Sequence, residues 1–370
     1  MGVRRKYLVV GALVAGLVVS GAVPIQVSAA KKPTKSVDVL LEGLNSPKGL
    51  ALDSFGDLVV AQGAFGPPDP VLLYLLTGKD RGDSFPVTDA VNLVDVAISP
   101  LDDTGWGIGP VETGEVHLFH QLAAGTVVDV LDIFAYQATD PDPVDQDIPP
   151  NPGESNPYGL TVTPEGDALI ADAAGNDIIK VTPDGVATTV ARFDLEVVAT
   201  DHLPPEFGLP PEMTAEAVPT SVTIGPDGAI YVGQLMGFPF RPGSSHVWRI
   251  DADADGVRCS VTAPEDGCEV YASGFTAIQD IAFNPHNGRL YVYELAEEGV
   301  FAFEEGFDEN GVPVGPFPPA VLLKVSPNGK HNEIAAGQLS EPGGIVVASN
   351  GKVYVTDGVF TGGRLAHIKG

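Results

Sequence analysis

Apolar and polar residues alternate in short runs along most of this chain, and one phrase of that pattern recurs six times. A clear copy is PYGLTVTPEGDALIAD at 157–172, in which two apolar runs flank a Pro-Glu-Gly turn. The glycines of four such turns, at 166, 228, 288 and 351, are 62, 60 and 63 residues apart. A fixed period of this kind predicts a repeat architecture with one supersecondary unit per copy. The copies begin near residues 47, 93, 157, 219, 277 and 342.

Each copy predicts four short strands. The third copy places them at 158–163, 168–172, 177–181 and 187–193, and the fourth at 220–224, 229–234, 246–250 and 269–272. The tight turns between them favour antiparallel pairing, because parallel neighbours need a long crossover. A lone four-stranded sheet cannot bury both faces, so such units stack around an axis. We therefore expect an all-β fold, a six-bladed β-propeller of four-stranded antiparallel blades.

The two ends of the chain predict how the ring closes. The last copy ends after its third strand, at 364–368, while the alternating segment VDVLL at 37–41 precedes the first copy. We expect this N-terminal segment to supply the outer strand of the last blade, because an unpaired strand edge would invite aggregation.

The longest insertions predict which side of the ring carries function. Connections after second and fourth strands lie on one rim of a propeller, and those after first and third strands lie on the other. The insertions 137–156, 194–218, 236–245 and 296–320 all follow a second or fourth strand. Long loops on one face of a rigid scaffold are the usual place for a binding site.

Residues 1–30 have the pattern of a secretory signal peptide. Basic residues at 4–6 precede an uncharged apolar run at 7–23, and small residues at 28–30 provide a cleavage site. An uncleaved membrane anchor is the alternative. We expect residues 31–370 to form a single domain that is secreted or periplasmic, with no stable membrane span after cleavage.

The chain is strongly acidic. Removing residues 1–30 takes away three positive charges and changes a formal net charge of −29 to −32. Such a surface repels nucleic acid, so we expect no nucleic-acid partner.

The two cysteines, Cys259 and Cys268, predict one disulfide, because nearby cysteines in an exported protein most simply pair. Between them and the preceding strand lies the run Asp251-Ala-Asp253-Ala-Asp255-Gly256, which resembles the start of a calcium loop. The last position of a full loop is Thr262 rather than Glu. The run predicts either a structural calcium site or a solvated acidic turn.

A second set of candidate residues gathers where strands meet the loop-rich rim and the axial channel. Carboxylates and amides there would suit a cation or a polar ligand, although aspartate at a strand end also commonly caps a turn. The candidates are Asn156, Tyr158, Asp172, Thr220, Gln234, Asp280, Glu294, Glu341 and Asp357.

Phenylalanines are frequent in two of the rim insertions. They would shelter an apolar small molecule, or else pack the insertions onto the scaffold. The sequence lacks a G-x-S-x-G nucleophile elbow and an H-E-x-x-H zinc motif. The residues are Phe238, Phe240, Phe301, Phe303, Phe307 and Phe317.

Several whole phrases carry a family resemblance. They are ESNPYGL (154–160), ADAAGNDIIKV (171–181), PTSVTIGPDGAIYVGQLMGFPFRPGSSHVWRI (219–250), ASGFTAIQDIAFNP (272–285) and EPGGIVVASNGKVYVTDG (341–358). In these phrases the chain resembles the ScyD/ScyE family of exported propeller proteins, and each copy alone is similar to NHL-type repeats. The resemblance implies an exported propeller and carries no catalytic motif.

Related gluconolactonase-type propellers hold a divalent metal in the axial channel through Glu, Asn and Asp. This chain has Tyr158-Gly159 where that resemblance implies Asn-Gly, and Ser221 near the expected aspartate. We therefore expect a binding or accessory protein whose loop-rich rim takes a small molecule or a protein partner. The alternatives are a metal-dependent enzyme of the lactonase or lyase type and a purely structural role.

Overall fold

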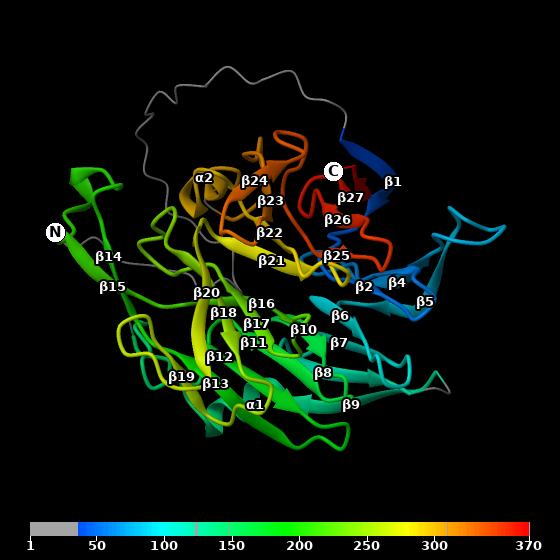
Figure 1. The fold of residues 1–370 in the computed structure, drawn as a ribbon, viewed down its shortest axis with the longest axis horizontal. Coiled ribbons are helices and arrows are strands. Elements are labelled where there is room, and N and C mark those ends of the chain that lie inside the picture. Colours follow the sequence, from blue (N-terminus) through cyan, green and yellow to red (C-terminus); the bar gives the residue numbers. More distant parts are fainter. Residues whose placement is uncertain (1–35, 123–124, 148, 309, 370) are drawn as a thin grey trace.

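The computed structural model describes residues 36–122, 125–147, 149–308 and 310–369, and the expected signal peptide at 1–30 lies outside these residues. Six four-stranded antiparallel sheets form a ring around one axis, which confirms the predicted six-bladed propeller (Figure 1). The inner strands contact one another all round the ring, from β2 through β6, β10, β16, β21 and β25 back to β2.

Blades are numbered here in chain order, and each is given from the axis outward. Blade 1 contains β2(Leu50–Leu52), β3(Leu58–Val60), β4(Asp69–Tyr74) and β5(Ser84–Val91), and blade 2 contains β6(Asp95–Ile98), β7(Gly105–Pro110), β8(Val116–Gln121) and β9(Val127–Asp132). Blade 3 contains β10(Pro157–Val162), β11(Ala168–Asp172), β12(Asp177–Val181) and β13(Ala187–Phe193), and blade 4 contains β16(Pro219–Ile224), β17(Ile230–Gln234), β18(Ser245–Ile250) and β20(Cys268–Phe275). Blade 5 contains β21(Ile278–Phe283), β22(Leu290–Glu294), β23(Val321–Val325) and β24(His331–Ile334), and blade 6 contains β25(Ile345–Val347), β26(Val353–Asp357), β27(Gly363–Ile368) and β1(Val37–Leu44).

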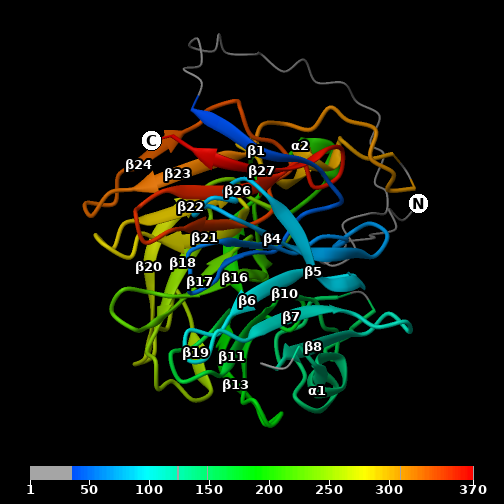
Figure 2. The same ribbon diagram turned by 90° about the vertical axis from the view of Figure 1, so that its right-hand side faces the viewer.

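The N-terminal strand closes the ring as predicted. β1 pairs antiparallel with β27, from Val37 opposite Ile368 to Leu44 opposite Gly363. Figures 1 and 2 both show β1, in blue, lying beside β27, in red. The pairing covers the outer edge of β27 and so removes an exposed strand edge at the join between the two ends of the chain.

Apolar side chains fill the spaces between blades. Trp248 of blade 4 packs with Leu169 and Ile178 of blade 3. Comparable clusters lie between the two blades of each of the five remaining neighbouring pairs. Second strands are therefore buried on both faces, and all five residues of β11 and of β26 are buried. This explains why these strands are nearly continuous apolar runs in the sequence.

The turns between first and second strands depend on left-handed glycines. Gly166 and Gly228 adopt φ values of 97° and 82°, which side chains with a Cβ rarely adopt. These turns form the short-turn rim, defined as the side that carries the connections after first and third strands. The opposite side, with the connections after second and fourth strands, is the loop-rich rim.

All four long insertions lie on the loop-rich rim, because each follows a second or fourth strand in the observed sheet order. They carry α1(Ile133–Thr139), η1(Pro205–Phe207), the hairpin of β14(Glu196–Ala199) and β15(Glu212–Ala215), and α2(Val300–Glu304). In Figure 1 the β14–β15 hairpin extends away from the ring on the left. No helix in the described ranges is long and apolar enough to cross a membrane.

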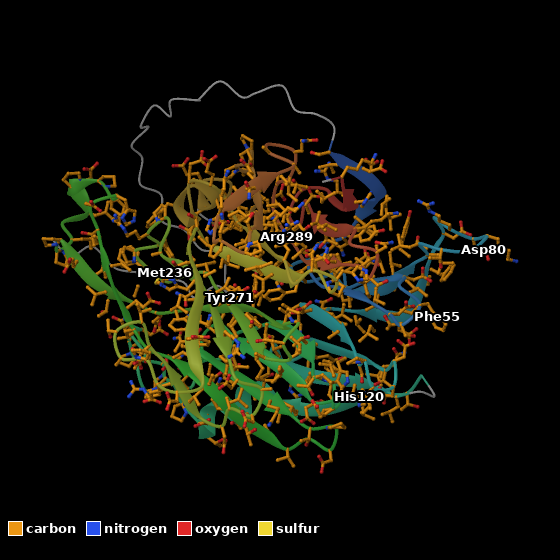
Figure 3. The ribbon with its side chains drawn as sticks, in the orientation of Figure 1. Phe55, Asp80, His120, Met236, Tyr271 and Arg289 are labelled. Carbon is orange, nitrogen blue, oxygen red and sulfur yellow. A yellow bond between two sulfur atoms is a disulfide. The ribbon has the colours of Figure 1, made fainter. Side chains whose placement is uncertain are left out.

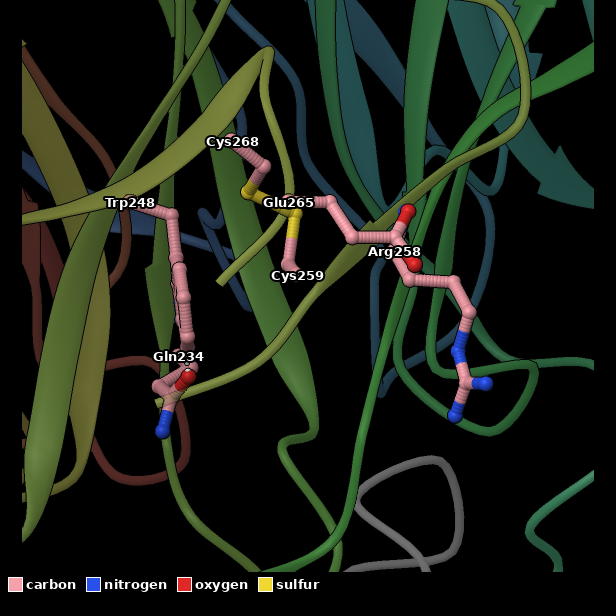
Figure 4. Close-up of a disulfide and its surroundings, with 6 residues drawn as sticks. All are labelled: Gln234, Trp248, Arg258, Cys259, Glu265 and Cys268. Atoms are coloured by element: carbon pink, nitrogen blue, oxygen red, sulfur yellow. Dashed lines mark hydrogen bonds between the residues drawn. A yellow bond between two sulfur atoms is a disulfide. The ribbon is translucent and has the colours of Figure 1, made fainter. Parts of the chain in front are cut away.

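Besides the hairpin of β14 and β15, a third strand was not predicted. β19(Val257–Cys259) leaves blade 4 and pairs parallel with β13 on the outer edge of blade 3, with Phe193 opposite Cys259. Cys259 and Cys268 form the predicted disulfide, with Cα atoms 5.3 Å apart (Figure 4). The disulfide thereby fixes the segment that joins the two blades.

Candidate functional site

The aromatic residues of the loop-rich rim form two packed clusters, which meet at α2. Phe303 is fully buried and contacts Phe307, Phe317 and Phe360, with ring centroids 5.0–6.0 Å apart. On the other side of α2, the rings of Phe207, Phe238 and Phe240 gather around Phe301. Most of the predicted phenylalanines therefore pack the insertions onto the scaffold.

The first cluster extends to a pocket on the loop-rich rim. Phe65 stacks on Phe360 with centroids 5.3 Å apart and planes 24° apart, and Phe65 remains 40% exposed. Both rings line a cavity of about 270 Å³ between blades 6 and 1. Asn45, Ser46, Thr361 and several glycines add polar groups to its wall. The cavity places an aromatic face among hydrogen-bonding groups, which suits a ligand that is partly aromatic and partly polar.

Buried polar side chains hold this pocket in shape. The Glu341 carboxylate, whose residue is 4% exposed, accepts hydrogen bonds from the Phe360 N–H at 2.8 Å and from the Thr361 hydroxyl at 2.5 Å. The Ser46 hydroxyl accepts one from the Phe65 N–H at 3.0 Å. Because both phenylalanines are fixed through their backbones, the stacked pair is organised before any ligand arrives.

The axial channel contains a second cavity, of about 250 Å³, lined by residues of all six inner strands. Asp95 of blade 2 and Asp280 of blade 5 lie at one end of its lining, on opposite sides of the ring. The lining continues to the last residues of the inner strands, among them Ile224 and Phe283, so the cavity runs toward the short-turn rim.

The two aspartates occupy the same position in their blades and make the same bonds. Asp95 accepts from the Leu160 N–H of the next blade at 2.8 Å, and Asp280 accepts from the Ile345 N–H at 2.8 Å. Each also accepts its following backbone N–H, at 2.9 Å and 2.7 Å. The carboxylates therefore tie neighbouring blades together as well as lining the channel.

A buried layer separates this cavity from the loop-rich rim. Lys48, which is 5% exposed, donates from Nζ to the Tyr158 carbonyl at 2.6 Å and lies 3.7 Å from the centroid of the Tyr158 ring. The Tyr158 hydroxyl accepts from Gln279 Nε2 at 2.6 Å. Because Lys48, Tyr158 and Gln279 are all buried, a ligand would reach the aspartates from the short-turn rim.

Burial and mutual repulsion shift the titration of these groups. Burial raises the pKa of Asp280 to about 7, and the charge of Asp95 adds to the rise. Burial also raises the pKa of Asp95, while the Lys48 charge opposes that rise. The pKa of Lys48 is lowered by burial, against the attraction of both carboxylates. A carboxyl pKa near neutral pH suits a general acid or base.

The channel residues do not fit the divalent metal that gluconolactonase-type propellers hold. Tyr158 and Ser221 supply no carboxylate. The backbones of Gly159 and Ser221 are so close that a Cβ added at Gly159 would lie 2.8 Å from the Cα of Ser221. Lys48 instead places a positive charge beside both aspartates. A cation would have to compete with that charge, so we derive no metal chemistry at this position.

The remaining predicted rim residues are separated and mostly engaged in structural bonds. Asp172 Oδ1 accepts backbone N–H groups of Asn156, Ala174 and Gly175, so Asp172 caps the β11–β12 turn. The Thr220 hydroxyl donates to the Ile278 carbonyl at 2.6 Å. The structure thus divides the predicted set among individual blades instead of gathering it into one site.

At the ends of the other second strands, each polar side chain has its own partners. Gln234 donates to Glu196 Oε1 at 3.0 Å and accepts from the Trp248 indole (Figure 4 shows the last pair). Glu294 accepts from the Thr276 N–H at 2.8 Å, and burial raises its pKa to about 8. The Asp357 carboxylate accepts two hydrogen bonds from Arg364, each of 2.6 Å.

The expected calcium loop lies on the short-turn rim, after β18. Asp251 accepts from Arg249 at 2.7 Å, while Asp253 and Asp255 are exposed. Within the described residues, no group of three or more His, Cys, Asp or Glu side chains is placed to hold a metal ion. Calcium binding by this loop stays a prediction.

Sequence reasoning missed Lys48, Asp95, Phe65 and Phe360. A signal existed for two pairs of residues. Asp95 and Asp280 stand where four other copies have Gly or Ser, and Phe65 and Phe360 each end a Gly-x-Phe phrase after a second strand. In contrast, nothing in the sequence marks Lys48 as buried. His120, labelled in Figure 3, is also buried, stacked 3.9 Å from Trp106 rather than facing a ligand.

No family model and no curated protein sequence matches the chain. Among solved structures, a glucose dehydrogenase is 13% identical, with a TM-score of 0.55 over 91% of this chain and 100% of its own. The soluble aldose sugar dehydrogenase of Escherichia coli is 13% identical, with a TM-score of 0.52 over 90% and 99%. A protein of unknown function from Bacteroides thetaiotaomicron is 11% identical, with a TM-score of 0.53 over 89% and 75%. At such identities the likeness shows that this chain shares their fold.

Proposed function

We propose that this protein is an exported ligand-binding or accessory propeller, and that it takes a small molecule into the pocket of Phe65 and Phe360. The stacked, partly exposed pair on the wall of a preformed cavity is the observation that carries the proposal. The grouping of every long insertion on the same rim supports it. The disulfide and the resemblance to the ScyD/ScyE family support an extracytoplasmic location.

The chemistry of the pocket points to a flat, uncharged ligand with one aromatic face and several polar groups. The Phe65 ring offers a stacking face, while Ser46, Thr361 and the glycine backbones surround it with polar groups. The formal net charge of −29 opposes anionic ligands. Aromatic stacking adds about 0.5–1.5 kcal/mol beyond the burial of surface, so loss of one ring should weaken binding by roughly tenfold.

A fluorescence titration with the neutral naphthalene probe prodan tests the proposal. Phe65→Ala should raise its Kd by about tenfold. Phe55→Ala is the matched control, because Phe55 is 77% exposed and lies in the β2–β3 turn on the opposite rim (Figure 3). Equal binding by Phe65→Ala and the unchanged protein would refute the pocket as the site.

The axial channel supports a second candidate, an enzyme that uses Asp280 as a general acid or base. The pKa of about 7 in a cavity that also holds Asp95 favours this chemistry. Hydrolysis of the lactone dihydrocoumarin, measured with and without added Ca²⁺ or Zn²⁺, tests the lactonase form of the idea. If the protein is such an enzyme, it should hydrolyse dihydrocoumarin faster than buffer alone does. Asp280→Asn should abolish this activity, and Asp253→Asn should retain it. A hydrolysis rate equal to that of buffer alone would refute the lactonase hypothesis and favour the binding function.

A further inference from the structure

Two fully buried aspartates lie directly opposite each other on adjacent strands of blade 3. Asp172 ends β11 and pairs directly with Asp177, which begins β12, and both side chains are 0% exposed. Directly opposed residues on neighbouring strands have Cβ atoms about 4.5–5.5 Å apart, and like charges at such positions destabilise a sheet. Burial raises the pKa of Asp177 well above its usual range, and the charge of Asp172 adds to the rise.

Blade 6 shows what normally balances a carboxylate at this position. Asp357 ends β26 as Asp172 ends β11, and its cross-strand partner is Arg364, whose guanidinium binds both carboxylate oxygens. The equivalent partner in blade 3 is the second aspartate. Arg192 lies opposite Asp177 on β13, and its charge opposes the rise of the Asp177 pKa, but its guanidinium is ion-paired to Asp140 at 2.5 Å. Within the described residues, neither Asp172 nor Asp177 has an ion pair of the kind that Arg364 gives Asp357 in blade 6.

A buried glutamine from α1 donates hydrogen bonds to both aspartates. Gln137 of α1 is 0% exposed, and its Nε2 lies 3.0 Å from Asp177 Oδ1 and 3.3 Å from Asp172 Oδ2. Gln137 Oε1 and Asp177 Oδ2 have no hydrogen-bond partner. Buried polar atoms are rarely left without a partner, and one such atom on Asp177 and another on the adjacent Gln137 indicate a missing partner. Gly175 is needed here, because a Cβ would come within 2.1 Å of Gln137 Nε2.

We propose that blade 3 binds a hard metal cation, with Ca²⁺ the first to test, between Asp172, Asp177 and Gln137 on the loop-rich rim. A half-turn of the Gln137 amide exchanges Nε2 for Oε1 and directs an oxygen at the space between the carboxylates. The Ser155 hydroxyl, 2.6 Å from Asp172 Oδ2, is a further oxygen ligand. Carboxylate, amide and hydroxyl oxygens are the ligands that Ca²⁺ takes. With only two carboxylates, this set differs from the aspartate-rich β18 loop.

The test compares thermal unfolding of the full-length mature protein in EDTA and in saturating CaCl₂. Calcium should raise the Tm by roughly 3–5 °C. Asp177→Asn, which removes one of the opposed charges, should be more stable than the unchanged protein in EDTA and should not respond to calcium. Asp253→Asn is the matched control and should keep the full response, because Asp253 belongs to the β18 loop.

Two results would overturn the proposal. One is an unchanged Tm in calcium together with no metal in the purified protein, which would mean that Asp177 carries a proton and donates it to Gln137. The other is a response lost in Asp253→Asn but kept in Asp177→Asn, which would place calcium in the β18 loop. If Asp177→Asn does not fold, Gln137→Met takes its place and should weaken calcium binding at least tenfold by calorimetry.

Discussion

Replacement of Lys48 by methionine tests the electrostatics of the axial channel most sharply. The change keeps an unbranched side chain of similar length but removes the charge that offsets Asp95 and Asp280. Removal of one partner from a buried charge pair typically costs about 3–5 kcal/mol, because the other charge stays buried and unpaired. The lost bond to the Tyr158 carbonyl and the contact with its ring are included in that range.

The cost should depend on pH. Burial already raises the pKa of Asp280 to about 7, so its ionised form destabilises the fold as pH rises from about 4 through 7. Without Lys48 both carboxyl pKa values rise further, because the attraction that opposed burial is gone. We therefore expect a loss of about 3–5 kcal/mol at pH 8 and of only about 1–2 kcal/mol at pH 5, where Asp280 carries a proton.

Equilibrium urea unfolding at the two pH values measures both losses. Lys79→Met is the matched control, since the Lys79 side chain is 91% exposed, and it should change stability by less than about 0.5 kcal/mol. A Lys48→Met loss that is the same at pH 5 and pH 8 would show that the side chain matters for packing and that its charge does not.

Three other changes give independent checks by unfolding experiments. Replacing Cys259 and Cys268 by serine opens a loop whose ends are 9 residues apart, and should cost about 2–3 kcal/mol in urea unfolding. Arg364→Met leaves the Asp357 carboxylate buried at 1% exposure and should cost about 3–5 kcal/mol, most of which Asp357→Asn in the same chain should restore; no recovery would count against the pair. The Glu294 pKa of about 8 predicts that stability falls as pH rises from about 4.5 through 8, so Glu294→Gln should stabilise the protein at pH 9 by about 2–4 kcal/mol and have little effect at pH 5.

The repeat made most of the fold predictable. Strands buried on both faces and separated by glycine turns have a strong local pattern, and the predicted strand at 168–172 matches β11 at both ends. Ring closure was also predictable, because a blade short of one strand and a spare strand stood at opposite ends of the chain. β19 could not be predicted, because it pairs with a strand of another blade. It is also only three residues long, which is too short to show an alternating pattern.

The sites were less predictable because they depend on contacts between distant copies. Phe65 and Phe360 come from the first and last blades, and only ring closure brings them together. Lys48 resembles any exposed lysine in the sequence, and its burial follows from its place in the layer above the channel cavity. Asp172 shows a different case, in which one carboxylate oxygen of a predicted site residue accepts backbone N–H groups of a turn, as strand-end aspartates often do.

A crystal structure of the mature protein with prodan bound would test the rim pocket most directly. The binding proposal predicts the naphthalene ring stacked on Phe65, within the cavity bounded by Phe360 and Ser46. Density for the probe in the axial channel beside Asp280, or on the short-turn rim near Phe55, would contradict it.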